Sequence, residues 1–176
     1  MKKKLTMIFT ALFLVALFSE CTLAHDGTIY ITGVIHKKTC TIAPDSQTLT
    51  VPMDSVQSLY FTQPGMGADY HPFAINVENC AGTEGSVSIT FDGTPDTVNP
   101  DLLTLIGGEG YATGIGVGIY NQDKSLISIG SKSQDILIIP HQSDAILHFY
   151  ARYIATASTV TTGTANATTT FILNYA

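Results

Sequence analysis

The chain has 176 residues, of which 45% are hydrophobic, and it carries 14 Asp and Glu against 8 Lys and Arg. This length fits a single domain. Nucleic acids and anionic membrane surfaces are bound through clusters of Lys and Arg, so the acidic balance argues against both as partners.

The first 24 residues have the pattern of a secretory signal peptide. Three lysines at positions 2–4 precede an apolar run at 8–18, and Ala24 supplies a small residue for cleavage. A transmembrane anchor is the alternative, but the run is shorter than the roughly 20 residues that a membrane helix needs. Cleavage would leave 152 residues with five Lys and Arg against 13 Asp and Glu, a net charge of −8.

Three cysteines are present, and the leader contains one of them. Lipidation of Cys21 is disfavoured because Glu20 stands where a lipoprotein signal has a small residue. Cys40 and Cys80 remain, and in an oxidising compartment an isolated pair is most simply a disulfide. The alternative is two free thiols or half a metal site, although the chain has no CxxC motif and neither cysteine is interpreted as having a His at metal-ligand spacing.

Short stretches with period-two alternation follow one another along the rest of the chain. They are bounded by turn residues and predict strands or strand-like segments. These stretches are residues 28–35, 39–42, 47–53, 58–61, 73–80, 86–91, 113–120, 126–129, 135–140, 145–155 and 165–175. A short helical turn is expected after Pro100, because proline favours the first turn of a helix.

This pattern predicts an all-β domain. Eight or more short strands with frequent turns and one long-range cysteine pair are typical of an immunoglobulin-like sandwich. A closed β-barrel is the alternative, since strand spacing alone does not separate the two.

Residues with possible catalytic or ligand-binding chemistry show no convincing arrangement. The five histidines, at positions 25, 36, 71, 141 and 148, lack metal-ligand spacing and are interpreted as surface or strand-face residues. Glycines 114, 116 and 118 lie within a strand pattern rather than before a helix, so they are expected to make room for bulky neighbours. No catalytic residue, metal site or cofactor is predicted, and the protein is not expected to be an enzyme.

The first and last strands of the mature chain each carry an apolar stripe. Residues 28–35 place Ile29, Ile31, Gly33 and Ile35 on one face, and residues 165–175 end with Phe171, Leu173 and Tyr175. The two could pair within one molecule. Alternatively, the first strand of one molecule could complete the sheet of another.

The sequence resembles the subunits of chaperone–usher fimbriae, especially the type 1 group, along nearly the whole mature chain. The resemblance rests on several motifs, of which the C-terminal one is the most specific. The motifs are G-T-x-x-x-x-G at 27–33, V-x-x-C at 77–80, V-x-I-x-F-x-G-T at 87–94, G-x-G-x-x-I at 114–119, F-Y-A-R-Y at 149–153, Gly163 fourteenth from the end and a penultimate Tyr175.

This resemblance implies an incomplete immunoglobulin-like domain, residues 39–176, that is completed by donor-strand complementation. An N-terminal extension, residues 25–38, would then supply Ile29, Ile31, Gly33 and Ile35 to a neighbouring subunit. Gly163, Phe171, Leu173, Tyr175 and Ala176 would form the acceptor groove and the motif that a chaperone binds. The implied partners are a periplasmic chaperone, an outer-membrane usher and neighbouring subunits, on a route through the periplasm to a cell-surface fimbria.

A structural fimbrial subunit is therefore the predicted function. Only two residues precede Gly27 in the mature chain, which favours a minor or adaptor subunit over a major rod subunit. A carbohydrate-binding adhesin is a second possibility, but it would need an additional lectin domain. A secreted enzyme is a third, and no residue constellation supports it.

Overall fold

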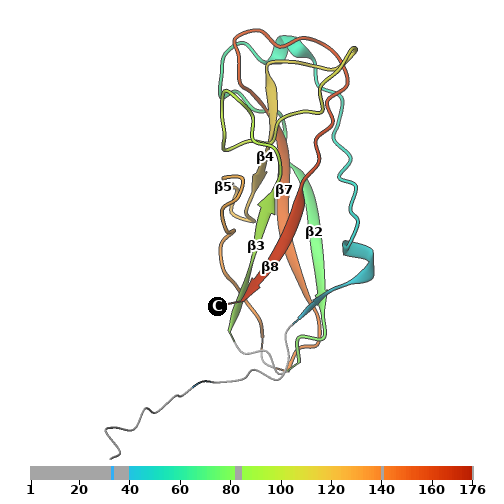
Figure 1. Cartoon of the computed structure of the whole chain (residues 1–176), viewed down its shortest axis with the longest axis vertical. Helices are drawn as coiled ribbons and strands as arrows, with labels where there is room; N and C mark the ends of the chain where they lie inside the picture. Colours follow the sequence, from blue (N-terminus) through green and yellow to red (C-terminus); the bar gives the residue numbers. More distant parts are fainter. Residues whose placement is uncertain (1–32, 34–39, 82–84, 140, 176) are drawn as a thin grey trace, which may run out of the picture. The chain divides into compact units, whose positions relative to one another are not determined.

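The computed structural model describes residues 33, 40–81, 85–139 and 141–175 (Figure 1). The chain divides into two compact units, Met1–Ile35 and His36–Ala176, and every described strand belongs to the second. The predicted signal peptide, the isoleucines of the predicted donor strand (Ile29, Ile31 and Ile35) and Ala176 lie outside the described residues.

The described domain consists of two antiparallel sheets, which confirms the all-β prediction and its sandwich form. The five-stranded sheet has the order β1 (Thr41–Ile42), β2 (His71–Glu78), β7 (Ala145–Ala155), β4 (Ile115–Tyr120) and β5 (Leu126–Ile127). The three-stranded sheet has the order β6 (Ile136–Leu137), β3 (Ser86–Asp92) and β8 (Thr170–Tyr175). Two 3-10 helices, η1 (Pro44–Ser46) and η2 (Ser58–Tyr60), interrupt the chain before β2.

The core lies between the two sheets and follows the alternation read from the sequence. Ile75 and Val77 of β2 and Ile89 of β3 are at most 1% exposed, because every second side chain of a strand faces the opposite sheet. Phe91 of β3 meets Phe149 of β7 edge to face, with ring centroids 5.2 Å apart. This aromatic contact joins the sheets at the centre of the core.

The glycines of β4 make room for neighbours, as expected from the sequence. A Cβ on Gly116 would lie 3.1 Å from Leu102, and one on Gly118 would lie 2.9 Å from the ring of Tyr120. Real Cβ atoms seldom approach other atoms so closely. These two glycines therefore admit large side chains close to the sheet.

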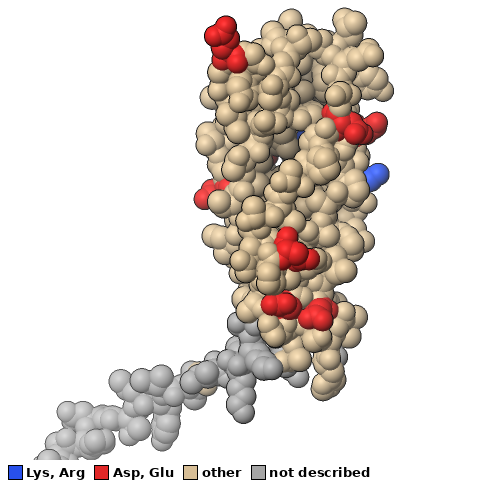
Figure 2. All heavy atoms as spheres, turned by 90° about the vertical axis from the view of Figure 1, so that its right-hand side faces the viewer, with Lys and Arg blue, Asp and Glu red and all other residues tan. Residues whose placement is uncertain are grey.

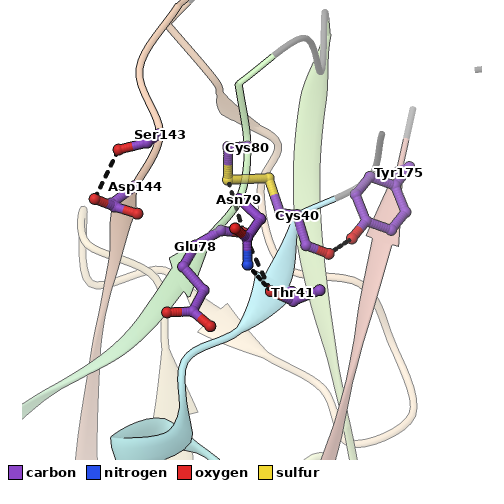
Figure 3. The surroundings of a disulfide bond; sticks show 8 residues. All are labelled: Cys40, Thr41, Glu78, Asn79, Cys80, Ser143, Asp144 and Tyr175. Carbon is purple, nitrogen blue, oxygen red and sulfur yellow. Dashed lines mark hydrogen bonds between the residues drawn. A yellow bond between two sulfur atoms is a disulfide. The ribbon is translucent and has the colours of Figure 1, made fainter. Parts of the chain in front are cut away.

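Cys40 and Cys80 form the predicted disulfide, with Cα atoms 4.3 Å apart (Figure 3). Strand β2 ends at Glu78, and Asn79 has a positive φ of 59°, which turns Cys80 into the core at 1% exposure. The side-chain amide of Asn79 donates to the Thr41 hydroxyl at 3.0 Å. The bridge therefore ties β1 to the end of β2, and in the chain-entropy model closing a loop of about 40 residues stabilises the fold by roughly 4 kcal/mol.

Four predicted local structures differ from those observed. Residues 58–61, expected as a short strand, contain η2, and the chain after Pro100 forms a turn instead of a helix. That turn is held by Asn99, whose backbone carbonyl accepts a hydrogen bond from the amide of Leu102 at 3.0 Å and whose side-chain oxygen accepts one from the amide of Asp101 at 3.2 Å. Residues 47–53 and 165–169 alternate as predicted, but they belong to no strand among the described residues.

Candidate strand-binding groove

A groove of about 980 Å³ opens into the core of the described domain. Residues 47–53 form one wall and residues 165–171 form the other. In Figure 1 these segments are the cyan chain beside β2 and the red chain leading into β8. The floor consists of core side chains from both sheets, namely Phe73, Ile75, Phe91, Leu103, Val117, Ile119, Ala151 and Tyr153.

The first wall has the side-chain pattern of a strand but no backbone ladder. Val51 and Met53 are partly buried against the core, whereas Thr50 and Pro52 between them are exposed. Among the described residues, no backbone hydrogen bond involves residues 47–53. Backbone groups that face a groove in this way are available to a peptide strand.

The second wall is the continuation of an edge strand. Strand β8 pairs with β3 through Phe171↔Phe91, Leu173↔Ile89 and Tyr175↔Val87. Upstream of β8, none of the amides of residues 165–169 donates to the backbone of another described residue. The Asn166 carbonyl accepts from the amide of Ile106 at 2.7 Å, which anchors this wall from behind.

Tyr153 supports the second wall from the groove floor. Its hydroxyl donates to the Ala165 carbonyl at 2.7 Å, and burial raises the pKa of the phenol above its usual value. Tyr153 therefore keeps its proton and its donor role throughout the physiological pH range.

The predicted site residues lie on the second wall and its two ends. Phe171 lines the groove, and Leu173 packs against the core on the same face of β8. Tyr175 is 40% exposed, and its hydroxyl donates to the Cys40 carbonyl (Figure 3). The structure brings these three residues onto one strand, while Gly33 is exposed and has no atom within 4 Å of the position of a Cβ.

Gly163 lies where the second wall meets the loop before β4. A Cβ at this position would lie 2.4 Å from the carbonyl carbon of Tyr111 and 2.5 Å from the amide nitrogen of Ala112. Both are backbone atoms, which cannot move aside as a side chain can. The glycine therefore permits a close backbone crossing at the start of the wall.

A second, smaller cavity of about 330 Å³ continues the groove beyond Gly163. It shares Met53, Tyr153, Ala165 and Asn166 with the larger one. The rest of its lining consists of Asp54, Ser55, Val56, Ser58, Phe61, Ala112, Ile115 and residues 160–163. The shared lining residues show that the two cavities are neighbours.

The face of the domain shown in Figure 2 is mostly uncharged, and the charged side chains on it are mainly Asp and Glu. Between described residues the structure contains no ion pair and no group of three potential metal ligands. His71 and His148 lie on β2 and β7, and His141 lies in the loop before β7. In the part of the chain that the structure describes, no helix is long and apolar enough to span a membrane.

Sequence reasoning placed the groove beside the last strand but did not find its first wall or its floor. Alternation of Leu49, Val51 and Met53 was the signal for the first wall, and it indicates one contacting face without saying what that face contacts. The floor residues Leu103 and Val117 come from distant segments that only the tertiary fold brings together.

Comparison with known proteins identifies the family of the chain. The family model described as "Fimbrial protein" matches residues 29–176. The fimbrial-like protein YcbV of Escherichia coli strain K12 is 35% identical over 97% of this chain and 99% of its own length. The probable major fimbrial subunit LpfA of Escherichia coli O157:H7 is 33% identical over 98% of this chain and 97% of its own.

A chain from a solved chaperone–usher pilus shares the fold. It superposes with a TM-score of 0.65 at 20% identity, covering 90% of this chain and all of the other. The matched sandwich therefore has the immunoglobulin-like architecture of pilus subunits. Together, the family match and the relatives show that the chain belongs to the fimbrial protein family and is a fimbrial subunit.

Proposed function

We propose that this protein is a structural subunit of a chaperone–usher fimbria and that it polymerises by donor-strand exchange. The observation that carries the proposal is the groove between residues 47–53 and 165–171, whose floor consists of core side chains. Among the described residues, residues 47–53 make no backbone hydrogen bond, and no amide of residues 165–169 donates to the backbone. A single β-strand with an apolar face would fill it. The added strand would complete the sandwich and satisfy backbone groups on both walls.

The proposed donor is the N-terminal extension of a neighbouring subunit, residues 25–38. Its residues Ile29, Ile31 and Ile35 would enter the groove, and Gly33 would face a place without room for a side chain. Burying three isoleucines contributes about 5–9 kcal/mol before ordering costs are subtracted.

Before assembly, we propose that a periplasmic chaperone lends a strand to the same groove, with Phe171, Leu173 and Tyr175 on the pairing strand and Ala176 at its end. An outer-membrane usher would then exchange that strand at export to the cell surface.

The position in the fibre has two candidates. The short extension before Gly27 supports a minor or adaptor subunit, as predicted from the sequence. The printed description of LpfA as a probable major subunit supports a repeated rod subunit instead. The two differ in whether the groove accepts the strand of a second copy of the same chain.

Binding of a synthetic donor peptide tests the proposal. Mature protein is expected to self-associate or unfold readily alone, and to become a stable monomer when a peptide of residues 25–38 is added. Thermal melting and size-exclusion chromatography would report both properties, with a scrambled peptide of the same composition as the control. A protein that is already a stable monomer, and whose melting temperature does not change with the peptide, would overturn the donor-strand proposal.

A further inference from the structure

The predicted mature chain contains two methionines, Met53 and Met66. They are the side chains that peroxide oxidises most readily in it, because the chain has no Trp and Cys40 and Cys80 are joined in the disulfide. Oxidation of a thioether to a sulfoxide turns a flexible apolar side chain into a polar one. The surroundings of the two sulfur atoms therefore decide where an oxidant acts on the protein.

Met53 lies where the two cavities of the strand-binding groove meet. It is one of the four residues that line both cavities. Its side chain is partly buried against the core, whereas its chain neighbours Pro52 and Asp54 are exposed. Because its side chain borders both cavities, a small oxidant that enters either of them reaches Met53.

The chain around Met53 is held in place by side-chain packing. Val51, Met53 and Val56 pack against the core, but among the described residues no backbone hydrogen bond involves residues 47–56. No described residue donates a hydrogen bond to the sulfur of Met53. Its lone pairs are therefore available to attack a peroxide oxygen.

Met66 has different surroundings and provides a reference within the same chain. Its sulfur accepts a hydrogen bond from the Thr62 hydroxyl at 3.1 Å, and this contact lies at the exposed surface. Its carbonyl accepts from the amide of Ala155 at 2.8 Å, which fixes it beside the end of β7. Met66 lines neither cavity of the groove, so a strand bound there would leave its exposure unchanged.

We propose that Met53 is a modification site at which peroxide blocks the groove against a donor strand. Hydrogen peroxide transfers one oxygen atom to the Met53 thioether: an S–O bond forms, the O–O bond breaks, and water leaves. The sulfur is oxidised and the peroxide is reduced, so no further reactant is needed. The inference rests on the proposed donor-strand exchange and adds a chemical sensitivity to the same groove.

The sulfoxide weakens strand binding because of what surrounds it. Core side chains such as Val117 and Tyr153 form the groove floor, and the proposed donor strand brings isoleucines to them. A polar S–O group buried among apolar side chains without a hydrogen-bond donor is unfavourable. A bound strand in turn covers Met53, so the two events oppose each other: a filled groove resists oxidation, and an oxidised groove resists filling.

Mass spectrometry after peroxide treatment tests the protection of Met53. Dilute mature protein, shown to be folded by circular dichroism, is treated with hydrogen peroxide alone or with the peptide of residues 25–38, which contains no Met or Cys. With the peptide at ten times its Kd, oxidation of Met53 should slow about tenfold, because about a tenth of the grooves remain free. Oxidation of Met66 should keep its rate. Equal protection of the two methionines, or of neither, would overturn the proposal.

Two matched variants test the effect of the sulfoxide on binding. Met66→Leu retains only the groove methionine, and Met53→Leu retains only the other; Leu is close to Met in volume, so both should bind the peptide as the wild type does before treatment. After peroxide treatment, Met66→Leu should bind the peptide about tenfold more weakly, whereas Met53→Leu should bind it unchanged. In the wild type, the loss of affinity should follow the fraction of Met53 converted, which gives the same test without a substitution.

The outcomes separate this proposal from donor-strand exchange itself. Failure of the untreated wild-type protein to bind the peptide would overturn donor-strand exchange, and with it the role of Met53. Peptide binding that is equally tight before and after complete oxidation of Met53 would overturn the role of Met53 alone.

Discussion

Single residues hold the ends of the groove and the turns of the sheets in place. At the β4–β5 turn, Asp123 accepts hydrogen bonds from the amide and hydroxyl of Ser125 at 2.9 and 2.6 Å and from the side-chain amide of Gln134 at 2.7 Å. Gln134 precedes β6, so this one carboxylate connects the edges of the two sheets. At the groove, Gly163 permits a backbone crossing that no other residue type would allow.

The hydrogen bonds to Asp123 make stability depend on pH in the acid range. Donation from Ser125, and then from Gln134, lowers the pKa of the carboxyl from 3.8 to about 2. The folded-state pKa is depressed, so the stabilisation is complete above about pH 4 and is lost as pH falls towards 2. Asp123→Asn should lower the denaturation midpoint at neutral pH and flatten its pH profile between 4 and 2. Asp101→Asn, whose exposed carboxylate accepts no hydrogen bond from a described residue, is the control, and identical profiles for both variants would contradict the prediction.

Gly163→Ala should destabilise the domain by roughly 1–3 kcal/mol, because the added methyl group has backbone atoms of Tyr111 and Ala112 within 2.5 Å. Urea denaturation of the peptide-complemented protein would measure the loss. Gly107→Ala is the matched control, since no atom lies within 4 Å of the position of a Cβ there. Equal midpoints for the two variants would show that the crossing is not tight.

At the scale of elements, the groove is the space of one absent strand. Residues 47–53 and 165–169 both alternate as strands do, and among the described residues neither is part of a sheet. An alternating segment acquires a ladder only when a neighbouring backbone lies within hydrogen-bonding distance. Both segments face the same groove, so one inserted strand would supply the missing neighbour to each of them.

Gly33→Leu tests the fit of the proposed donor strand. Among the described residues, no atom lies within 4 Å of the position of a Cβ on Gly33, so we expect the larger side chain not to destabilise the domain that carries it. In the groove of another copy it would meet the core, so joining should fall at least tenfold while the variant still accepts a wild-type peptide. Competition between wild-type and Gly33→Leu peptides would measure the difference, with Gly33→Ala as an intermediate. Polymerisation of Gly33→Leu at the wild-type rate would refute the donor-strand role of this segment.

At the scale of the whole molecule, charge opposes assembly. The predicted mature chain has five Lys and Arg against 13 Asp and Glu, and no ion pair joins the described residues. Two such copies repel each other in dilute salt, whereas the apolar side chains of the groove and of the donor strand would attract each other. The strength of assembly is therefore expected to depend on ionic strength.

Added salt should speed the joining of copies. Raising ionic strength from 0.01 to 0.15 M shortens the screening length from about 30 to about 8 Å and weakens repulsion between chains of net charge −8. The peptide of residues 25–38 provides a control of opposite sign. It carries Lys37 and Lys38 against Asp26, so its attraction to the acidic domain should weaken with salt. Joining rates of chain and peptide that change in the same direction would contradict this electrostatic account.

The sequence by itself determined the strands, the disulfide and the family. Alternation in β2, β3, β7 and the end of β8 is strong because each buries one face against the opposite sheet, and this requirement is local to each strand. Two cysteines without other ligands left one simple pairing. The motifs at the C-terminal end, including Gly163 and Tyr175, carried the family resemblance.

Only the tertiary structure decided which alternating segments obtain partners and which line a groove. Residues 47–53 and 165–175 have similar patterns, yet only the end of the latter pairs, because β3 lies beside it and residues 47–53 have no comparable neighbour. The pairings of Val87 with Tyr175 and of Ile115 with Ala155 likewise join residues that are distant along the chain. Local periodicity reports that a side chain needs burial, whereas long-range pairing decides what buries it.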